Sequence, residues 1–204
     1  SETGFSEFFT VSDIISILKC TYKHFDEDLF RSYCQRFDIP LDKKTRTFST
    51  GMKAKLNIII ALTHHAKLLI LDEPTAGLDV LTRDEILDIL RDYMEQEDCT
   101  ILISSHISSD LESLCDDLYI IDHGKIIMHE EMDTLLSLYG VLKVSKEDYK
   151  NLDKDYLLEV MKEPFGYSCL TNVRQFYSEN YPTIVIEQNH IDTMIPILLK
   201  GERL

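Results

Sequence analysis

Two adjacent carboxylates, Asp72 and Glu73, come directly after a short apolar run at positions 68–71. Such a run is typical of a buried parallel strand, and open α/β sheets bind their ligands at the carboxyl ends of their strands. Successive strand residues point to opposite faces, so the two carboxylates can do different work. One can hold a magnesium ion through its water shell, and the other can orient or deprotonate an attacking water. The alternative is that the pair begins a loop and caps the helix that follows.

A second candidate is the turn formed by Ser49, Thr50 and Gly51, directly before a predicted helix. Backbone N–H groups at a helix N-terminus attract anions, and the Ser49 hydroxyl adds a donor for phosphate oxygens. The turn can therefore contact a phosphate group. The alternative is an ordinary helix N-cap, for which serine is equally suited.

His106 lies just past a second apolar run, at positions 100–104. From the end of a core strand its imidazole can reach a terminal phosphate or the attacking water, whereas the alternative is a solvated loop histidine. Asp79 begins a segment with helical spacing, positions 79–97, and can cap that helix. These candidates are far apart in sequence, so only a particular fold can bring them together.

The order and spacing of these residues resemble those of the ATP-binding cassette (ABC) ATPases, the ATP-hydrolysing subunits of ABC transporters. Residues 48–52 look like the signature loop of that family, with threonine and methionine where it usually has glycine and glutamine. Residues 68–73 look like its Walker B strand, 76–79 like its D-loop, and His106 like its switch histidine. The resemblance extends from residue 1 to about residue 140.

For the Walker B region the resemblance implies catalytic roles. Glu73 would be the general base for hydrolysis, and His106 would be a second catalytic residue near the terminal phosphate or the attacking water. Asp72 would bind Mg²⁺, through water. ATP and Mg²⁺ are therefore the cofactors that the resemblance implies.

For the signature loop and the D-loop the resemblance implies contacts within a pair of subunits. Cassettes of this family pair head to tail, and each signature loop closes the ATP site of the other subunit. Ser49, Thr50 and Gly51 would contact a partner-bound nucleotide, and Asp79 would lie in the loop between the paired cassettes. The implied partners are a second ABC ATPase subunit, identical or different, and a transmembrane permease subunit.

The sequence departs from the family at the phosphate cradle. The P-loop motif G-x-x-x-x-G-K-[ST], whose amides and lysine hold the phosphates, occurs nowhere in the 204 residues. The Q-loop glutamine of the family aligns with either Ser1 or Glu2, and the sequence does not decide between these two positions. We therefore expect a fragment of an ABC ATPase that is inactive by itself.

The expected fold class is α/β, a partial P-loop NTPase core of the ABC ATPase type with a helical subdomain and a small α+β C-terminal extension. Residues 1–66 should contain the Q-loop remnant, the helical subdomain and the signature helix. Residues 67–140 should form the C-terminal half of the ATPase core, and residues 141–204 the extension.

Periodicity and turn residues predict the individual elements. Up to residue 140 they indicate a first helix with cap residues at 10–13 and apolar residues at 14–18, and further helices near 26–37, 51–65 and 79–97. They also indicate a parallel strand pair at 67–71 and 100–104 covered on both faces, a hairpin at 118–122 and 125–129, and a helix at 131–139 capped by Gly140. After it they indicate a strand at 141–144, a helical stretch at 146–161, a strand at 183–186 and a helix from 191.

Composition narrows the class of protein. Lys and Arg number 21 against 36 Asp and Glu, and the resulting net charge of −15 repels nucleic-acid backbones, so no nucleic-acid partner is expected. The apolar runs, such as 68–71, are far shorter than the roughly 20 residues of a membrane-spanning helix. The 5 cysteines are odd in number and never form C-x-x-C, which is typical of reduced, mostly buried thiols in a cytosolic protein.

The expected function is that of the ATP-hydrolysing subunit of an ABC transporter, of the bacterial exporter type, that couples hydrolysis to translocation through a separate membrane subunit. Its expected location is cytoplasmic and peripheral, on the inner face of the cell membrane. Two alternatives stay open: a soluble ABC ATPase that is not coupled to transport, and a non-catalytic dimerisation or regulatory module.

Overall fold

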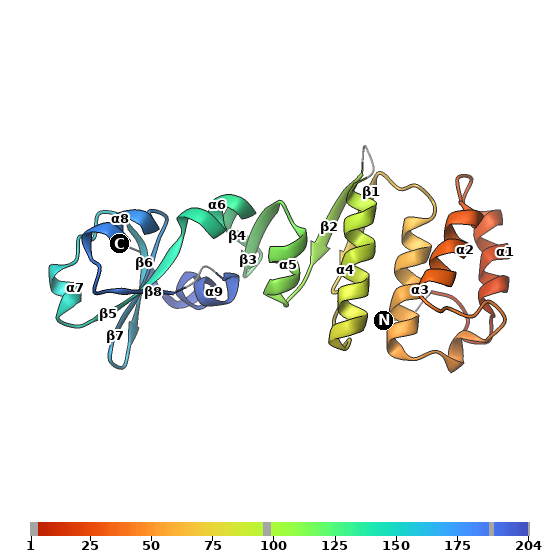
Figure 1. Ribbon diagram of the computed structural model, residues 1–204, viewed down its shortest axis with the longest axis horizontal. Helices are drawn as coiled ribbons and strands as arrows, with labels where there is room; N and C mark the ends of the chain where they lie inside the picture. Colours follow the sequence, from red (N-terminus) through yellow and green to blue (C-terminus); the bar gives the residue numbers. More distant parts are fainter. Residues whose placement is uncertain (1–3, 96–98, 188–189, 204) are drawn as a thin grey trace. The chain divides into compact units, whose positions relative to one another are not determined.

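The computed structural model describes residues 4–95, 99–187 and 190–203. The chain divides into two compact units, Ser1–His106 and Ile107–Leu204 (Figure 1). Ser1 and Glu2, where the Q-loop glutamine was expected, lie outside the described residues. The division of the chain at residues 66 and 140 stays a prediction.

The first unit opens with helices α1 (Val11–Thr21), α2 (Glu27–Arg36) and α3 (Thr50–Leu62), and a short 3₁₀ turn, η1 (Thr45–Thr47), precedes α3. Thr10 and Asp13 form a capping box at the start of α1, and Asp26 caps α2 by accepting from the backbone N–H of Leu29. The apolar residues at helical spacing are fully buried, among them Ile14, Leu18, Phe30, Leu56 and Ile59. The three predicted helices are therefore confirmed, with their ends shifted by a few residues.

Strands β1 (Leu68–Asp72) and β2 (Thr100–Ser104) form the predicted parallel pair, with α4 (Val80–Met94) between them in sequence. Asp72 lies directly opposite Ser104 in this pair. One face is covered, since Leu69 is only 4% exposed. On the other face Leu68, Ile70 and Leu102 are 52%, 70% and 58% exposed. The expectation that both faces of the strand pair are covered is therefore wrong for the described residues. Both faces carry apolar side chains, but only one of the two faces is packed against other residues.

Polar contacts fix α4 within the first unit. The Tyr93 hydroxyl donates to the carbonyl of Ala66, just before β1. Arg36 of α2 forms an ion pair with Asp92 of α4 at 2.5 Å. A second ion pair, between Lys55 and Glu85, joins α3 to α4. Helix α4 is thus connected both to the start of β1 and to the helical part of the unit.

The second unit begins with α5 (Ser108–Leu114) and the predicted hairpin, formed by β3 (Asp117–Asp122) and β4 (Lys125–Glu131). Its two-residue turn places His123 at φ 45° and Gly124 at φ 75°. Two positive φ values are what a type I′ turn requires, and that turn matches the twist of a hairpin. Helix α6 (Met132–Leu138) follows directly.

The rest of the second unit is a five-stranded antiparallel sheet of order β8-β5-β7-β6-β9 with three helices. The strands are β5 (Gly140–Ser145), β6 (Leu157–Glu163), β7 (Gly166–Thr171), β8 (Val185–Glu187) and β9 (Glu202–Arg203), and the helices are α7 (Asp148–Asn151), α8 (Arg174–Asn180) and α9 (Ile191–Lys200). Adjacent residues of β5 point to opposite faces: Val141 packs with residues of α9, and Leu142 packs with Tyr177 of α8. Both faces of this sheet are therefore covered.

Two sequence expectations in this region are wrong. Residues 146–161 form only the short helix α7 and then β6, because Leu157 and Val160 are buried where β6 pairs with β7. Gly140 is not a helix cap but the first residue of β5, opposite Thr171. A larger residue would not fit at position 140 without a shift of its neighbours, because a Cβ there would lie 3.0 Å from Cγ of Arg174.

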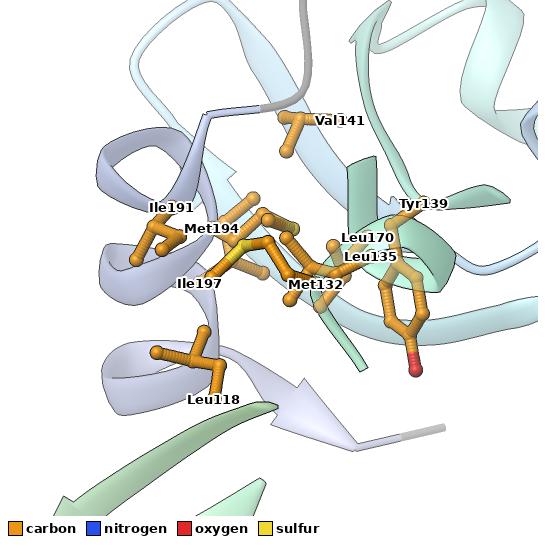
Figure 2. Close-up of a cluster of buried hydrophobic side chains, with 9 residues drawn as sticks. All are labelled: Leu118, Met132, Leu135, Tyr139, Val141, Leu170, Ile191, Met194 and Ile197. Atoms are coloured by element: carbon orange, nitrogen blue, oxygen red, sulfur yellow. The ribbon is translucent and has the colours of Figure 1, made fainter. Parts of the chain in front are cut away.

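A single hydrophobic core joins residues on both sides of position 140 (Figure 2). Leu118, Met132, Leu135 and Tyr139 come from the hairpin, α6 and the residue after it, and they pack against Val141, Leu170, Ile191, Met194 and Ile197. All nine are at most 8% exposed. The C-terminal residues are thus packed onto the elements that follow β2 in sequence.

Burial keeps three of the cysteine thiols protonated. Burial raises the pKa of Cys34 and of Cys169 to about 12, and that of Cys115 to about 11. These thiols are protonated at neutral pH, and no cysteine takes part in a disulfide in the part of the chain that the structure describes. Cys20 is exposed. In the described part of the chain, no helix is both long and apolar enough to cross a lipid bilayer.

Candidate functional site

The carboxyl ends of β1 and β2 bring Glu73 and His106 into contact. Glu73 Oε2 lies 2.7 Å from Nδ1 of His106 and accepts from the His106 backbone N–H at 3.3 Å. The two residues are 33 positions apart in sequence, and parallel pairing of the strands places them at the same edge. Their side chains are 36% and 69% exposed, so water reaches both. The structure therefore brings Glu73 and His106 together, and their catalytic roles stay a prediction.

Ser104 completes this edge and was missed by the sequence analysis. Its hydroxyl donates to Asp72 Oδ1 at 2.5 Å. The backbone N–H of Glu73 donates to the Ser104 carbonyl at 3.0 Å and contacts its hydroxyl oxygen at 3.3 Å. Ser104 thus holds the carboxylate of Asp72 and the backbone of Glu73. Its position could have been found, because the last residues of two parallel strands of equal length must face each other.

The backbone of Glu73 adopts an uncommon conformation. Its φ is 47°, in the left-handed region where residues other than glycine are seldom found. Such conformations cost on the order of 1–3 kcal/mol and cluster at functional sites. The turn is closed by the Ala76 backbone N–H, which donates to the Glu73 carbonyl at 3.2 Å. The backbone therefore turns sharply away from the direction of β1 at Glu73, and the Glu73 carboxylate lies beside His106.

Asp72 has the donor chemistry that Mg²⁺ prefers. It is exposed and lies on the uncovered face of β1, beside the Ser104 hydroxyl. One carboxylate with a neighbouring hydroxyl is an oxygen-donor set that suits Mg²⁺ when water and phosphate oxygens supply the remaining ligands. The residues present fit the ion that was expected here.

Ser49, in the turn before α3, is the N-cap residue of that helix. The backbone N–H of Met52 donates to Ser49 Oγ at 3.2 Å, so the ordinary N-cap interpretation of Ser49 is confirmed. Thr50 is exposed and is the first residue of α3. A Cβ on Gly51 would lie 3.0 Å from Thr82 Cγ2, which shows that the backbone of α3 passes close to α4. A contact of this turn with a nucleotide stays a prediction.

Thr82 also connects this turn to Asp79. Asp79 caps α4, because its carboxylate accepts from the Thr82 backbone N–H at 3.0 Å and from the Thr82 hydroxyl at 2.9 Å. The same threonine side chain is the one nearest to Gly51. The structure therefore brings Gly51 and Asp79 together through a residue that the sequence analysis did not single out. A polar residue at the third position of a capped helix is the signal that could have found it.

These hydrogen bonds predict a pH-dependent contribution of Asp79 to stability. The Thr82 backbone N–H, and then its hydroxyl, lower the pKa of the Asp79 carboxyl below its usual value. A lowered pKa in the folded state stabilises the fold above the unfolded pKa of about 3.9, and this stabilisation is lost as the pH falls through the folded pKa. We therefore expect Asp79→Ala to lower the free energy of unfolding at pH 7, and the difference from the wild type to shrink below about pH 4.

Urea unfolding at pH 7 and pH 3 measures this difference. Asp79→Asn is the matched control, because it keeps an oxygen acceptor for the helix N-terminus but carries no charge. At pH 7 it should lose only the part of the stability that depends on the charge, and so less than Asp79→Ala loses. An equal loss from Asp79→Ala at both pH values would show that the charge of Asp79 contributes nothing.

The chain is similar to several known proteins. Residues 13–109 match the model of a protein family described as AAA domain, AbiEii toxin, Type IV TA system, which is a P-loop family. The ABC transporter ATP-binding protein YtrB of Bacillus subtilis is 30% identical over 151 residues, which cover 74% of this chain and 52% of that protein. The lantibiotic transport ATP-binding protein SrtF of Streptococcus pyogenes is 47% identical over 94 residues, 46% of this chain and 41% of that protein.

A solved structure of the ATP-binding subunit of an ABC transporter has the same arrangement over part of the chain. It superposes with a TM-score of 0.56 at 26% identity and covers 64% of this chain and 56% of that one. The chain spans about half the length, or less, of these curated relatives. Over the part that it spans, this chain is similar in both sequence and fold to the ATP-binding subunits of ABC transporters.

Proposed function

We propose that these residues are the hydrolytic part of the ATP-binding subunit of an ABC transporter of the bacterial exporter type. In this proposal the chain supplies the general base, the Mg²⁺ ligand and the signature turn, while a segment outside these 204 positions supplies the P-loop. The observation that carries the proposal is the 2.7 Å contact between Glu73 and His106 at the end of β1. The relatives named for transport, one of them for lantibiotic transport, support the transporter role.

The geometry suggests how the chain acts on ATP. A water molecule attacks the terminal phosphorus, the bond to the ADP oxygen breaks, and the water proton passes to the Glu73 carboxylate. His106 holds that carboxylate through its ring nitrogen and its backbone N–H, so that Glu73 does not swing into solvent. Asp72, oriented by Ser104, would hold Mg²⁺, which when bound offsets the charge on the phosphate oxygens.

The uncovered face of the β1–β2 pair supports the existence of a further segment. Parallel strands occur almost only in sheets whose two faces are both covered. Here Leu68, Ile70 and Leu102 are more than half exposed. Complete burial of a fully exposed side chain of this kind contributes roughly 1.5–3 kcal/mol, so covering each of them would gain half or more of that free energy. We infer that the segment with the P-loop packs on this face, which would bring the phosphates to the Asp72 side of β1.

The partners follow from the same proposal. The turn at Ser49, Thr50 and Gly51, joined to Asp79 through Thr82, would face the nucleotide of a second ATPase subunit. A permease subunit would hold the pair at the inner face of the membrane. ATP binding and hydrolysis would then close and reopen the two subunits.

Calorimetric titration with ATP and Mg²⁺ tests this proposal. The two proteins to compare are the 204-residue chain and an extended protein, meaning the same residues preceded by a segment that carries a P-loop. We expect binding heat only from the extended protein, because amides and the lysine of the P-loop provide most of the phosphate contacts. Tight binding by the 204-residue chain alone would contradict the division of roles proposed here.

A further inference from the structure

Helix α5 (Ser108–Leu114) begins two residues after His106 and is bound to the last helix of the chain, α9. The Ser108 hydroxyl donates to Asp192 Oδ1, a contact between residues 84 positions apart. Ser108 itself is only 6% exposed, so this hydrogen bond lies largely out of water. The first residue of α5 is therefore held by the first turn of α9.

A second contact lies one helical turn further along α5. The Glu112 carboxylate accepts from the Ile191 backbone N–H at 2.6 Å and lies 3.1 Å from Nδ1 of His190. The N-cap residue of α9, His190, makes no capping bond with its own side chain, so Glu112 takes that role from another helix. A carboxylate at a helix N-terminus satisfies an unpaired N–H and is favoured by the helix dipole. The Glu112 side chain is 14% exposed, which strengthens both effects.

Helix α9 is itself immobilised by the core of the second unit. Ile191, Met194 and Ile197 are each 1% exposed and converge on α6 and the five-stranded sheet (Figure 2). Leu111 of α5 packs against the same cluster. The polar contacts therefore attach α5 to an element that is firmly packed.

We propose that Ser108, Glu112 and Asp192 are positioning residues for His106. The ring and the backbone N–H of His106 are bound to Glu73, and two residues later Ser108 is bound to α9. Only Ile107 separates the two anchored residues. Loosening α5 gives the residues around Ile107 conformational freedom, and fixing His106 against Glu73 then costs more entropy. This gives the C-terminal residues a role in hydrolysis, and it rests on the proposed function of Glu73 and His106.

The test uses NMR spectra of the histidine rings in the 204-residue chain, so that it does not depend on ATPase activity. His106→Gln identifies the signal of His106 among the 7 histidines, and Glu73→Gln gives its position when the carboxylate is lost. In Asp192→Ala we expect the His106 signal to move toward that position. We also expect the α5 amides to exchange about tenfold faster, which corresponds to about 1.4 kcal/mol.

Two further variants serve as controls. Asp192→Asn keeps an oxygen acceptor for Ser108 and should restore the wild-type His106 signal. Thr193→Ala removes a neighbouring hydroxyl, which donates to the His190 carbonyl at 2.7 Å, and should leave the signal in place.

Each other result overturns the proposal in a distinct way. If Asp192→Ala lowers the stability of the second unit but leaves the His106 signal unchanged, the α5–α9 contact is merely structural and the positioning role is wrong. If Glu73→Gln itself leaves the signal unchanged, the contact between Glu73 and His106 does not exist in solution. In that case the proposed catalytic pair is wrong as well, and the positioning role is lost with it.

Discussion

Replacing Glu73 with glutamine should lower the rate of phosphate release by the extended protein about 10²- to 10⁴-fold, the usual contribution of a general base. Glutamine has nearly the same shape but cannot accept the proton of the attacking water. Binding of ATP should change little, because the phosphate contacts come from other residues. The measurement is the steady-state rate of phosphate release at saturating ATP and Mg²⁺.

Glu179→Gln is the matched control for this substitution. Glu179 lies on α8, where its carboxylate accepts from Gln175 at 2.8 Å, and the change removes the same charge. Its rate should equal that of the wild type. A Glu73→Gln protein that hydrolyses ATP at an undiminished rate would show that another group accepts the proton.

Replacing Leu135 with alanine should cost about 2–5 kcal/mol of stability, the usual range for a fully buried leucine. Leu135 is 0% exposed in the core shared by α6, α9 and the sheet. Because that core joins residues on both sides of position 140, the loss should affect residues 107–204 as one cooperative unit. Urea unfolding followed by two probes, one before and one after residue 140, measures both the loss and the cooperativity.

Leu138→Ala provides the control on the same helix. Leu138 is 52% exposed, and surface substitutions of this kind usually change stability by no more than about 0.5 kcal/mol. If Leu135→Ala shifted only the probe before residue 140, the C-terminal residues would form a separate folding unit. The packing seen in Figure 2 would then contribute little to the stability of either part.

The site could be predicted from sequence because it depends on strand ends. An apolar run that ends in two carboxylates, and another that ends shortly before His106, already predict a common edge once the strands are taken as parallel. The contact of Glu73 with His106 follows from that pairing. The left-handed backbone of Glu73 does not follow, because no local signal predicts a positive φ for glutamate followed by proline.

The second unit was harder to predict because its elements are determined by distant partners. Residues 157–161 belong to the stretch 146–161 that is predicted to be helical, whereas residues 157–163 form β6 because β7 supplies a hydrogen-bonding neighbour. The α5–α9 contact joins Ser108 to a residue 84 positions away, and neither residue carries a motif. Gly140 has the residue type of a helix cap, but the structure requires glycine there because the side chain of Arg174 lies close to it.

Calorimetric titration of ATP and Mg²⁺ is the most direct test of the central claim, that this chain holds the hydrolytic residues and another segment holds the phosphates. It needs three proteins: the 204-residue chain, the extended protein, and the extended protein with Glu73→Gln. We expect no binding heat from the first protein and equal affinities for ATP from the other two. Tight binding by the 204-residue chain alone, or loss of binding in the Glu73→Gln protein, would contradict it.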